Sequence, residues 1–102
     1  MERQEFEWGE IVTVAEKPTY RIRSIRVKAG HSYKLEPEHY AWEKLYLSNG
    51  EILLQFFKGG ESVSLCLTEG DGDLGRRVIG SEGALITALT KNVHLIETTY
   101  DY

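Results

Sequence analysis

The sequence predicts an all-β fold, and three observations carry this prediction. Ten glycines and only two prolines divide the 102 residues into short segments rich in valine, isoleucine, threonine, tyrosine and phenylalanine, which are the residue types that favour strands. Clusters of turn-forming residues separate these segments, at 48–50, 58–60 and 70–73. No segment shows the spacing of apolar residues that indicates an amphipathic helix.

The first half of the chain contains four expected strands. Segment 10–14 is rich in β-branched residues, and 20–28 alternates isoleucine and valine with arginine and lysine. Segment 31–36 alternates polar residues with Tyr33 and leucine, and 43–48 carries two leucines and a tyrosine. A period of two is typical of a strand with one face on a core.

Five further strands are expected in the second half, at 51–57, 62–68, 76–79, 84–89 and 92–99. The first of these is apolar on both faces, so we expect both of its sides to be covered. The Asn-Gly pair just before it, within Ser48-Asn49-Gly50-Glu51, predicts a tight hairpin, because Asn-Gly readily adopts the positive φ angles of a type I′ turn.

The length and charge of the chain bound its class. We expect one domain over residues 1–102, since this length supports a single hydrophobic core. Twelve basic against sixteen acidic residues give a net charge of −4, which argues against nucleic acid or an anionic membrane as a partner. No apolar run approaches the roughly 20 residues that cross a bilayer, and residues 1–5 form no apolar signal core, so we expect a cytoplasmic protein. The lone Cys66 has apolar neighbours, which predict a buried, unreactive thiol.

The most informative spacing in the chain is Gly30, Glu36, Glu38, Glu43 and Gly50. It resembles the first signature of the cupin superfamily, where Gly, two His, Glu and Gly stand at these intervals and the His, His and Glu bind a metal. Both histidine positions are glutamate in this chain. The resemblance therefore covers the turn glycines and one of the three ligands.

A second cupin signature, Gly, Pro, Gly, His and Asn, is matched in spacing by Gly75, Ser81, Gly83, Ile86 and Thr90. Its histidine position has become isoleucine. Three flanking segments, 8–10, 20–30 and 95–98, are similar to the cupin domain of type II mannose-6-phosphate isomerases. The resemblance implies a single-domain cupin-like jelly-roll β-barrel with a degenerate metal site and, often, a homodimer.

We therefore expect no metal and no other cofactor. Oxygen ligands alone would suit Mg²⁺, Mn²⁺ or Ca²⁺ better than Zn²⁺ or Fe²⁺, and an isoleucine removes one corner of the site. Without a cation, three converging carboxylates would repel one another unless they reach water or basic side chains. Alternatively, the first two glutamates flank Pro37 near solvent and are simply hydrated. The degenerate positions are Glu36, Glu38, Glu43 and Ile86.

Acid–base chemistry has two candidate residues, Glu43 and His39. A bulge at Pro37 could turn His39 inward, but an exposed loop histidine is the favoured interpretation, since nothing in the spacing requires the bulge. His31 and His94 are expected to be structural or solvent-facing.

Anion binding has its own candidates. Arg21 and Arg23 share a strand face and could bind a phosphate or a sugar acid, or could instead form salt bridges to nearby glutamates. With Lys34 and the four degenerate metal positions they complete the expected ligand-binding set.

An apolar outer surface is also expected. If the glutamate face of 31–36 lines the barrel, Tyr33 and Leu35 point outward, where a second subunit or the segment Phe6-Glu7-Trp8 would cover them. This surface, together with Trp42 and Tyr46, favours a homodimer.

Three functions remain open. The first is a non-catalytic binding module for a small polar ligand of the sugar or phosphosugar class, or for a protein partner. A second is an isomerase or epimerase that uses carboxylates as acid and base without a metal. The third is an interaction or inhibitor protein that acts through its outer apolar face.

Overall fold

The computed structural model describes residues 2–35, 42–69 and 83–100, apart from the side chains of residues 42, 43 and 58. These residues form nine strands and contain no helix, and hence none that could cross a bilayer. The strands are β1 (Glu2–Phe6), β2 (Gly9–Lys17), β3 (Tyr20–Val27), β4 (Ser32–Leu35), β5 (Trp42–Asn49), β6 (Glu51–Lys58), β7 (Glu61–Thr68), β8 (Ala84–Ala88) and β9 (Val93–Tyr100).

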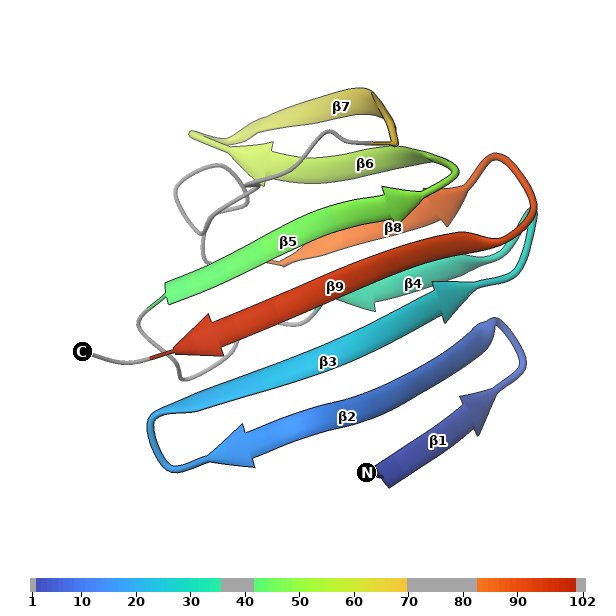
Figure 1. Cartoon of the computed structure of the whole chain (residues 1–102). Helices are drawn as coiled ribbons and strands as arrows, with labels where there is room; N and C mark the ends of the chain where they lie inside the picture. The colour runs from blue at the N-terminus through green and yellow to red at the C-terminus, as the bar shows by residue number, and fades with distance from the viewer. Residues whose placement is uncertain (1, 36–41, 70–82, 101–102) are drawn as a thin grey trace.

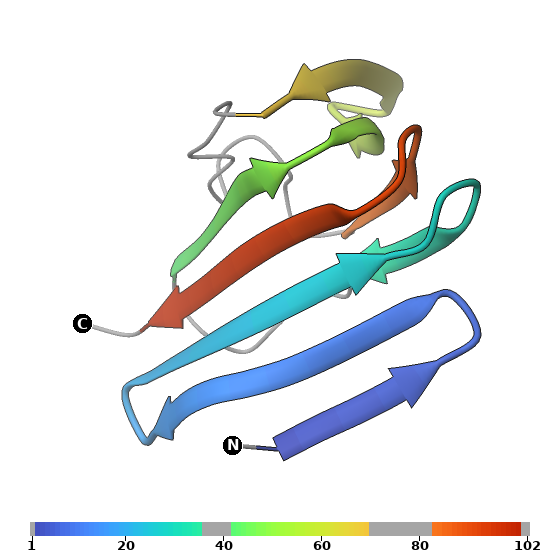
Figure 2. The ribbon, with the colours of Figure 1, turned by 45° about the vertical axis from the view of Figure 1, so that its right-hand side comes forward.

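The strands form two antiparallel sheets that lie face to face (Figures 1 and 2). Sheet A has the order β1-β2-β3-β9-β5, and sheet B has the order β4-β8-β6-β7. The chain crosses between the sheets at β3–β4, β4–β5, β5–β6 and β8–β9, so pairs such as β3–β9 and β4–β8 join distant parts of the sequence. The fold is an all-β, cupin-like jelly roll, as the sequence predicts.

A period of two along each strand places the core between the sheets. The strand β9 alternates between buried and half-buried residues over its whole length. Its Val93 and Leu95 pack with Ile25 of β3 against Leu54 and Ile86 of sheet B, and all five have no exposed surface. The side chains of the two inner faces thus form one apolar core.

The N-terminal segment adds a strand that sequence reasoning missed. Residues 2–6 pair with 9–13 as β1, at the edge of sheet A, although every residue of β1 is exposed. Because β1 is mostly charged and polar, its sequence carries no strand signal. The expected strand at 76–79 lies outside the described residues.

The expected hairpin at 48–51 is wrong. The strands β5 and β6 belong to different sheets, and Gly50 is the crossing point between them. Gly50 has a φ of 90°, and a Cβ there would come within 2.9 Å of Val93 and Thr90 side-chain atoms. Asn49 has no positive φ; instead its side-chain amide donates to the Asn92 carbonyl at 2.6 Å. The crossing therefore requires a glycine, both for its positive φ and because a side chain would not fit. It does not contain a type I′ turn.

The expected orientation of β4 is also wrong. Tyr33 and Leu35 face the core with 7% and 1% of their surface exposed, and Lys34 is exposed. Trp8 contacts Tyr33, with ring centroids 4.8 Å apart, so the N-terminal segment does cover this tyrosine, but from within the barrel. Two effects favour this orientation: it buries two large apolar side chains, and it keeps the lysine ammonium in water, where its hydration is retained.

Two expectations of burial in sheet B are wrong, because the side chains concerned are exposed. The outer side of β6 is not fully covered, since Phe57 is 56% exposed. Cys66, expected to be buried, is exposed. It stands opposite Leu53 in the register of β6 and β7, on the outer face of the sheet. Strand parity, rather than the apolar neighbours in sequence, decides its environment.

Candidate ligand site in the barrel interior

Three charged side chains point into the barrel from the middle of sheet A. Arg21 and Arg23 of β3 have the same parity as the buried Ile25, and Glu97 of β9 has the same parity as Leu95. Arg23 stands directly opposite Glu97 in the pairing of β3 and β9. The alternation that builds the core therefore also brings an acidic group and two basic groups together inside it.

The Glu97 carboxylate is fully buried, and one of its oxygens holds both arginines. Arg23 Nε donates to Glu97 Oε1 at 2.7 Å, Arg23 Nη2 lies 2.6 Å from the same oxygen, and Arg21 Nη2 lies 3.4 Å from it. The arginine side chains are only 13% and 14% exposed. Because both partners have lost much of their hydration, the pair is stable only when close contacts and well-directed hydrogen bonds compensate for that loss.

Arg23 also links the two sheets. Its Nη2 donates to the Tyr33 hydroxyl of β4 at 3.2 Å, so a side chain of sheet A contacts one of sheet B across the interior. Trp8 packs on the ring of the same tyrosine. The polar cluster is thereby fixed on one side by an aromatic wall.

The second carboxylate oxygen, Glu97 Oε2, is buried and has no hydrogen-bond partner among the described residues. Buried polar atoms are nearly always satisfied, and exceptions often mark a place where water or a ligand binds. An acceptor oxygen beside two guanidinium groups can bind a molecule that carries both a hydroxyl and an anionic group.

The structure separates the sequence-predicted residues. Arg21 and Arg23 lie together at this cluster, whereas Lys34 is on the outer face, beside Phe57 and Leu85. Ile86 is fully buried in the apolar core, opposite Tyr33 and Leu54 in the strand register.

The other predicted positions are only partly described. The backbone of Glu43 on β5 pairs with that of Thr99 on β9, and Thr99 pairs on its other side with Arg21 on β3. The strand β9 therefore lies between Glu43 and Arg21. The predicted positions that lie outside the described residues are Glu36, Glu38 and His39.

Of the four degenerate cupin ligand positions, only Ile86 has a side chain among the described residues. Ile86 offers no donor atom and sits among aliphatic side chains. Within the described ranges, no three histidine, cysteine, aspartate or glutamate side chains come close enough together to hold an ion.

The two histidines in the described ranges are structural or exposed, as expected. His31 is an exposed turn residue, and its backbone N–H donates to the Lys28 carbonyl at 2.9 Å. His94 is half-buried on the outer face of sheet A, with Nε2 2.6 Å from Ser24 Oγ. Burial, and secondarily the positive charge of Arg26, lower the pKa of His94 below its usual 6.5.

Sequence reasoning missed Glu97 and Tyr33 as members of the site. For Glu97 a signal was present: it occupies the apolar parity of β9, between Leu95 and Thr99. A charged residue at such a position needs a partner of opposite charge. For Tyr33, the wrong assumption about the inward face of β4 hid its role.

Comparisons with known proteins agree on the fold. No family model matches the sequence, and no curated protein matches it. Among solved structures, oxalate decarboxylase from Bacillus subtilis superposes with a TM-score of 0.81 at 18% identity, covering 99% of this chain and 28% of that enzyme. A formate complex of oxalate decarboxylase from Lactobacillus farciminis gives a TM-score of 0.77 at 15% identity, covering 98% of this chain and 31% of the enzyme.

A cupin superfamily protein from Desulfitobacterium hafniense has nearly the same size. It superposes with a TM-score of 0.73 at 17% identity, covering all of this chain and 84% of the other. The chain spans less than a third of the two decarboxylases. At these identities the likeness establishes the cupin fold and leaves the activity to the site itself.

Proposed function

We propose that this chain is a ligand-binding cupin that takes a small anionic, hydroxylated molecule of the sugar-acid or phosphosugar class in its barrel. The carrying observation is the buried Glu97 carboxylate, whose Oε1 is held by Arg21 and Arg23 while Oε2 has no partner among the described residues. In this proposal Oε2 accepts a ligand hydroxyl, and Arg21 contacts the anionic group.

Two resemblances support this ligand class. The first is inferred from the sequence alone: segments 20–30 and 95–98, which contain Arg21, Arg23 and Glu97, are interpreted as resembling type II mannose-6-phosphate isomerases. The structural neighbours are named for oxalate, and one was solved with formate; both are small carboxylate anions. Arginine suits such groups because its planar fork donates two parallel hydrogen bonds.

Titration calorimetry with mannose 6-phosphate and with glucuronate tests the proposal. We expect binding of at least one of them, with uncharged mannose binding more weakly. Glu97→Gln keeps the shape of the side chain but converts one acceptor oxygen into a donor, so it should weaken binding by about tenfold or more, on the scale of a hydrogen bond to a charged group. Arg3→Gln, on the exposed edge of sheet A, is the matched control. No binding of either anion by a folded wild-type protein would refute the proposal.

An isomerase or epimerase is the second candidate function. The same Oε2 atom favours it, because a carboxylate oxygen beside an arginine anchor could accept a proton from a substrate carbon. Proton exchange at the carbon next to the carbonyl, followed by NMR in D₂O with mannose 6-phosphate, would detect this chemistry. Glu97→Gln should abolish exchange while leaving measurable binding; exchange that continues unchanged in the variant excludes Glu97 as the base.

A homodimer in the cytoplasm completes the proposal, and sheet A offers the surface for it. Tyr46 is 47% exposed on the outer face and borders a hollow of about 290 Å³ together with Lys44, Ile96 and Thr98. Tyr46→Glu should convert dimer to monomer in light scattering, whereas Phe57→Glu on sheet B should not. Stable interfaces cover roughly 800 Å² per partner. A monomeric wild-type protein, or a dimer that only Phe57→Glu dissociates, would rule out this surface. The interaction-protein alternative would use the same face, without Tyr33 and Leu35.

A further inference from the structure

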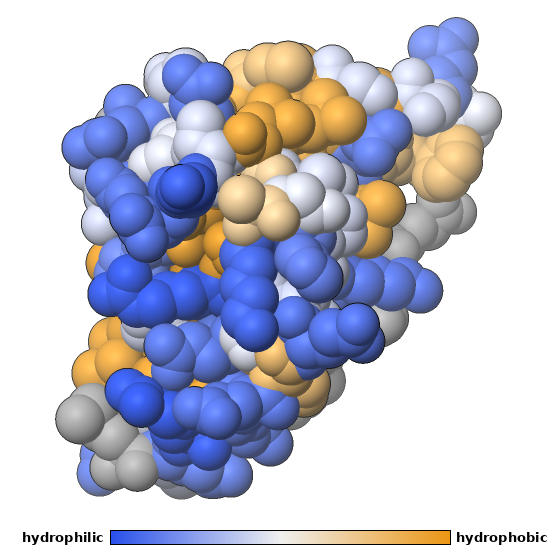
Figure 3. All heavy atoms as spheres, turned by 90° about the vertical axis from the view of Figure 1, so that its right-hand side faces the viewer, coloured by the Kyte–Doolittle hydropathy of each residue, from blue (hydrophilic) through white to orange (hydrophobic). Residues whose placement is uncertain are grey.

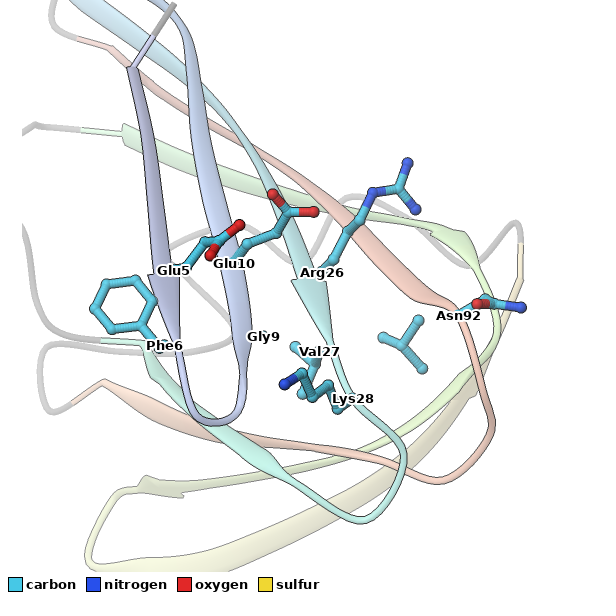
Figure 4. Close-up of a pocket in the computed structure, with 9 residues that line it drawn as sticks. Glu5, Phe6, Gly9, Glu10, Arg26, Val27, Lys28 and Asn92 are labelled. Carbon is cyan, nitrogen blue, oxygen red and sulfur yellow. The ribbon is translucent and has the colours of Figure 1, made fainter.

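A second hollow lies outside the barrel, at the end where the β1–β2 turn meets the end of β3 and the start of β9 (Figure 4). Its volume is about 320 Å³, near the lower limit for pockets that hold small organic molecules. In Figure 3, which faces this end, the lower part of the surface is mostly hydrophilic and apolar atoms gather higher up. The hollow is separate from Arg21, Arg23 and Glu97, none of which lines it.

Charges of both signs border the hollow. Glu5 and Glu10 lie side by side on β1 and β2, and Arg26 stands opposite Glu10 on β3. Lys28 follows at the end of the same strand. Cross-strand neighbours on one face are about 5 Å apart at Cβ, so the acidic and basic groups are within reach of a single small molecule.

Only one of the charged residues that line the hollow is already in an ion pair among the described residues. Glu10 pairs with Arg3, whose Nε lies 3.0 Å from Glu10 Oε2. Among the residues that the structure describes, Arg26, Lys28 and Glu5 form no ion pair. The positive and negative sides of the hollow are therefore both available to an incoming group.

An aromatic wall and a fixed backbone complete the hollow. Phe6 is 41% exposed and stacks on Trp8, with ring centroids 4.9 Å apart and planes 6° from parallel. Lys28 donates its backbone N–H to the Trp8 carbonyl at 2.7 Å, which ties the end of β3 to the β1–β2 turn. The walls are thus held in place by the fold itself, which lowers the cost of binding.

We propose that this hollow binds a free α-amino acid with an apolar or aromatic side chain. The ligand ammonium contacts Glu5 and Glu10, its carboxylate contacts Arg26 and Lys28, and its side chain lies against Phe6. A zwitterion fits because both of its charges find a partner of opposite sign. A simple anion or cation would leave half of the polar lining unused.

NMR titration of the ¹⁵N-labelled full chain with L-phenylalanine tests the proposal, with phenylpropionate and phenethylamine as probes that each keep one charge. We expect shifts of the amides of Phe6, Lys28 and Asn92, and binding of each single-charge probe weaker by about tenfold or more, because one charge-assisted contact is lost. Absence of these shifts at about 10 mM L-phenylalanine, a concentration that would populate even a weak complex, would overturn the proposal. Equal affinity for either single-charge probe would also overturn it.

Matched variants separate this site from the barrel site. Arg26→Gln and Glu5→Gln, both exposed, should each weaken L-phenylalanine binding by about tenfold, while Glu61→Gln on β7 should leave it unchanged. None of the three should alter the titration with mannose 6-phosphate. Loss of phenylalanine binding in Glu61→Gln, or its full retention in Arg26→Gln and Glu5→Gln, would contradict the assignment. A failure of sugar-phosphate binding would not affect it.

Discussion

Replacing Arg23 with methionine tests whether the buried charge cluster is coupled as the distances indicate. In the variant, Glu97 stays fully buried and loses its two shortest contacts, at 2.7 and 2.6 Å, keeping Arg21 at 3.4 Å. Removing one partner of a buried pair costs about 3–5 kcal/mol. Arg23 is 13% exposed, so solvent screening reduces this little. We expect about 3 kcal/mol of lost unfolding free energy, which lowers the thermal midpoint by more than about 10 °C in a chain of this length.

Urea denaturation of a double-mutant cycle measures the coupling. Arg23→Met with Glu97→Leu removes both charges and should be more stable than Arg23→Met alone, since replacing a whole buried pair by apolar groups is often neutral or better. Arg3→Met, which breaks the surface pair with Glu10, is the control and should cost about 0–1 kcal/mol. The reasoning is refuted if Arg23→Met costs no more than Arg3→Met, or if the two interior substitutions simply add.

Three further predictions follow from local features. The pKa of His94 is lowered in the folded protein, so the unfolded chain binds the proton more readily. The contribution of His94 to the unfolding free energy is therefore present above pH 6.5 and is lost as the pH falls below that value. Urea midpoints between about pH 5 and pH 8 should show this fall, and His94→Gln should flatten it; an equal fall in the variant assigns the effect elsewhere. Gly9→Ala should destabilise the fold by more than about 2 kcal/mol, because a Cβ there would lie 1.9 Å from the Arg26 carbonyl oxygen at a φ of 153°; denaturation measures it, and a cost below that of Gly59→Ala, where nothing lies within 4 Å, would be inconsistent with it. Cys66 is exposed and should react with a maleimide in the native state, as mass spectrometry would detect; protection until unfolding would contradict its position.

The fold could be predicted because strand signals are local. Alternation in 20–27 and 93–100 identifies β3 and β9, and their burial follows the expected period. What could not be predicted is which strands pair. The Asn49-Gly50 segment has the composition of a hairpin, yet the chain crosses there to the other sheet, because Gly50 packs against Val93 from β9. Such a packing constraint arises from residues more than forty positions away and leaves no mark near the turn.

The candidate site was predictable only in part. Arg21 and Arg23 share a face in any strand, so their alignment follows from the sequence. Their partner Glu97 comes from β9, and Tyr33 comes from the opposite sheet. Sequence spacing between such distant residues carries no information on contact, which is why the expected cluster contained Lys34 in their place.

By itself, the sequence determined the class of fold and the face on which each residue of a strand lies, because backbone sterics and a period of two act on neighbouring residues. Only the tertiary structure decided which of the two faces points inward. For β4 that choice buried Tyr33 and Leu35 and left Lys34 exposed, since removing apolar area from water is favourable and removing an ammonium group from water is costly. It also placed a carboxylate and two guanidinium groups in one interior, where each makes the burial of the others possible.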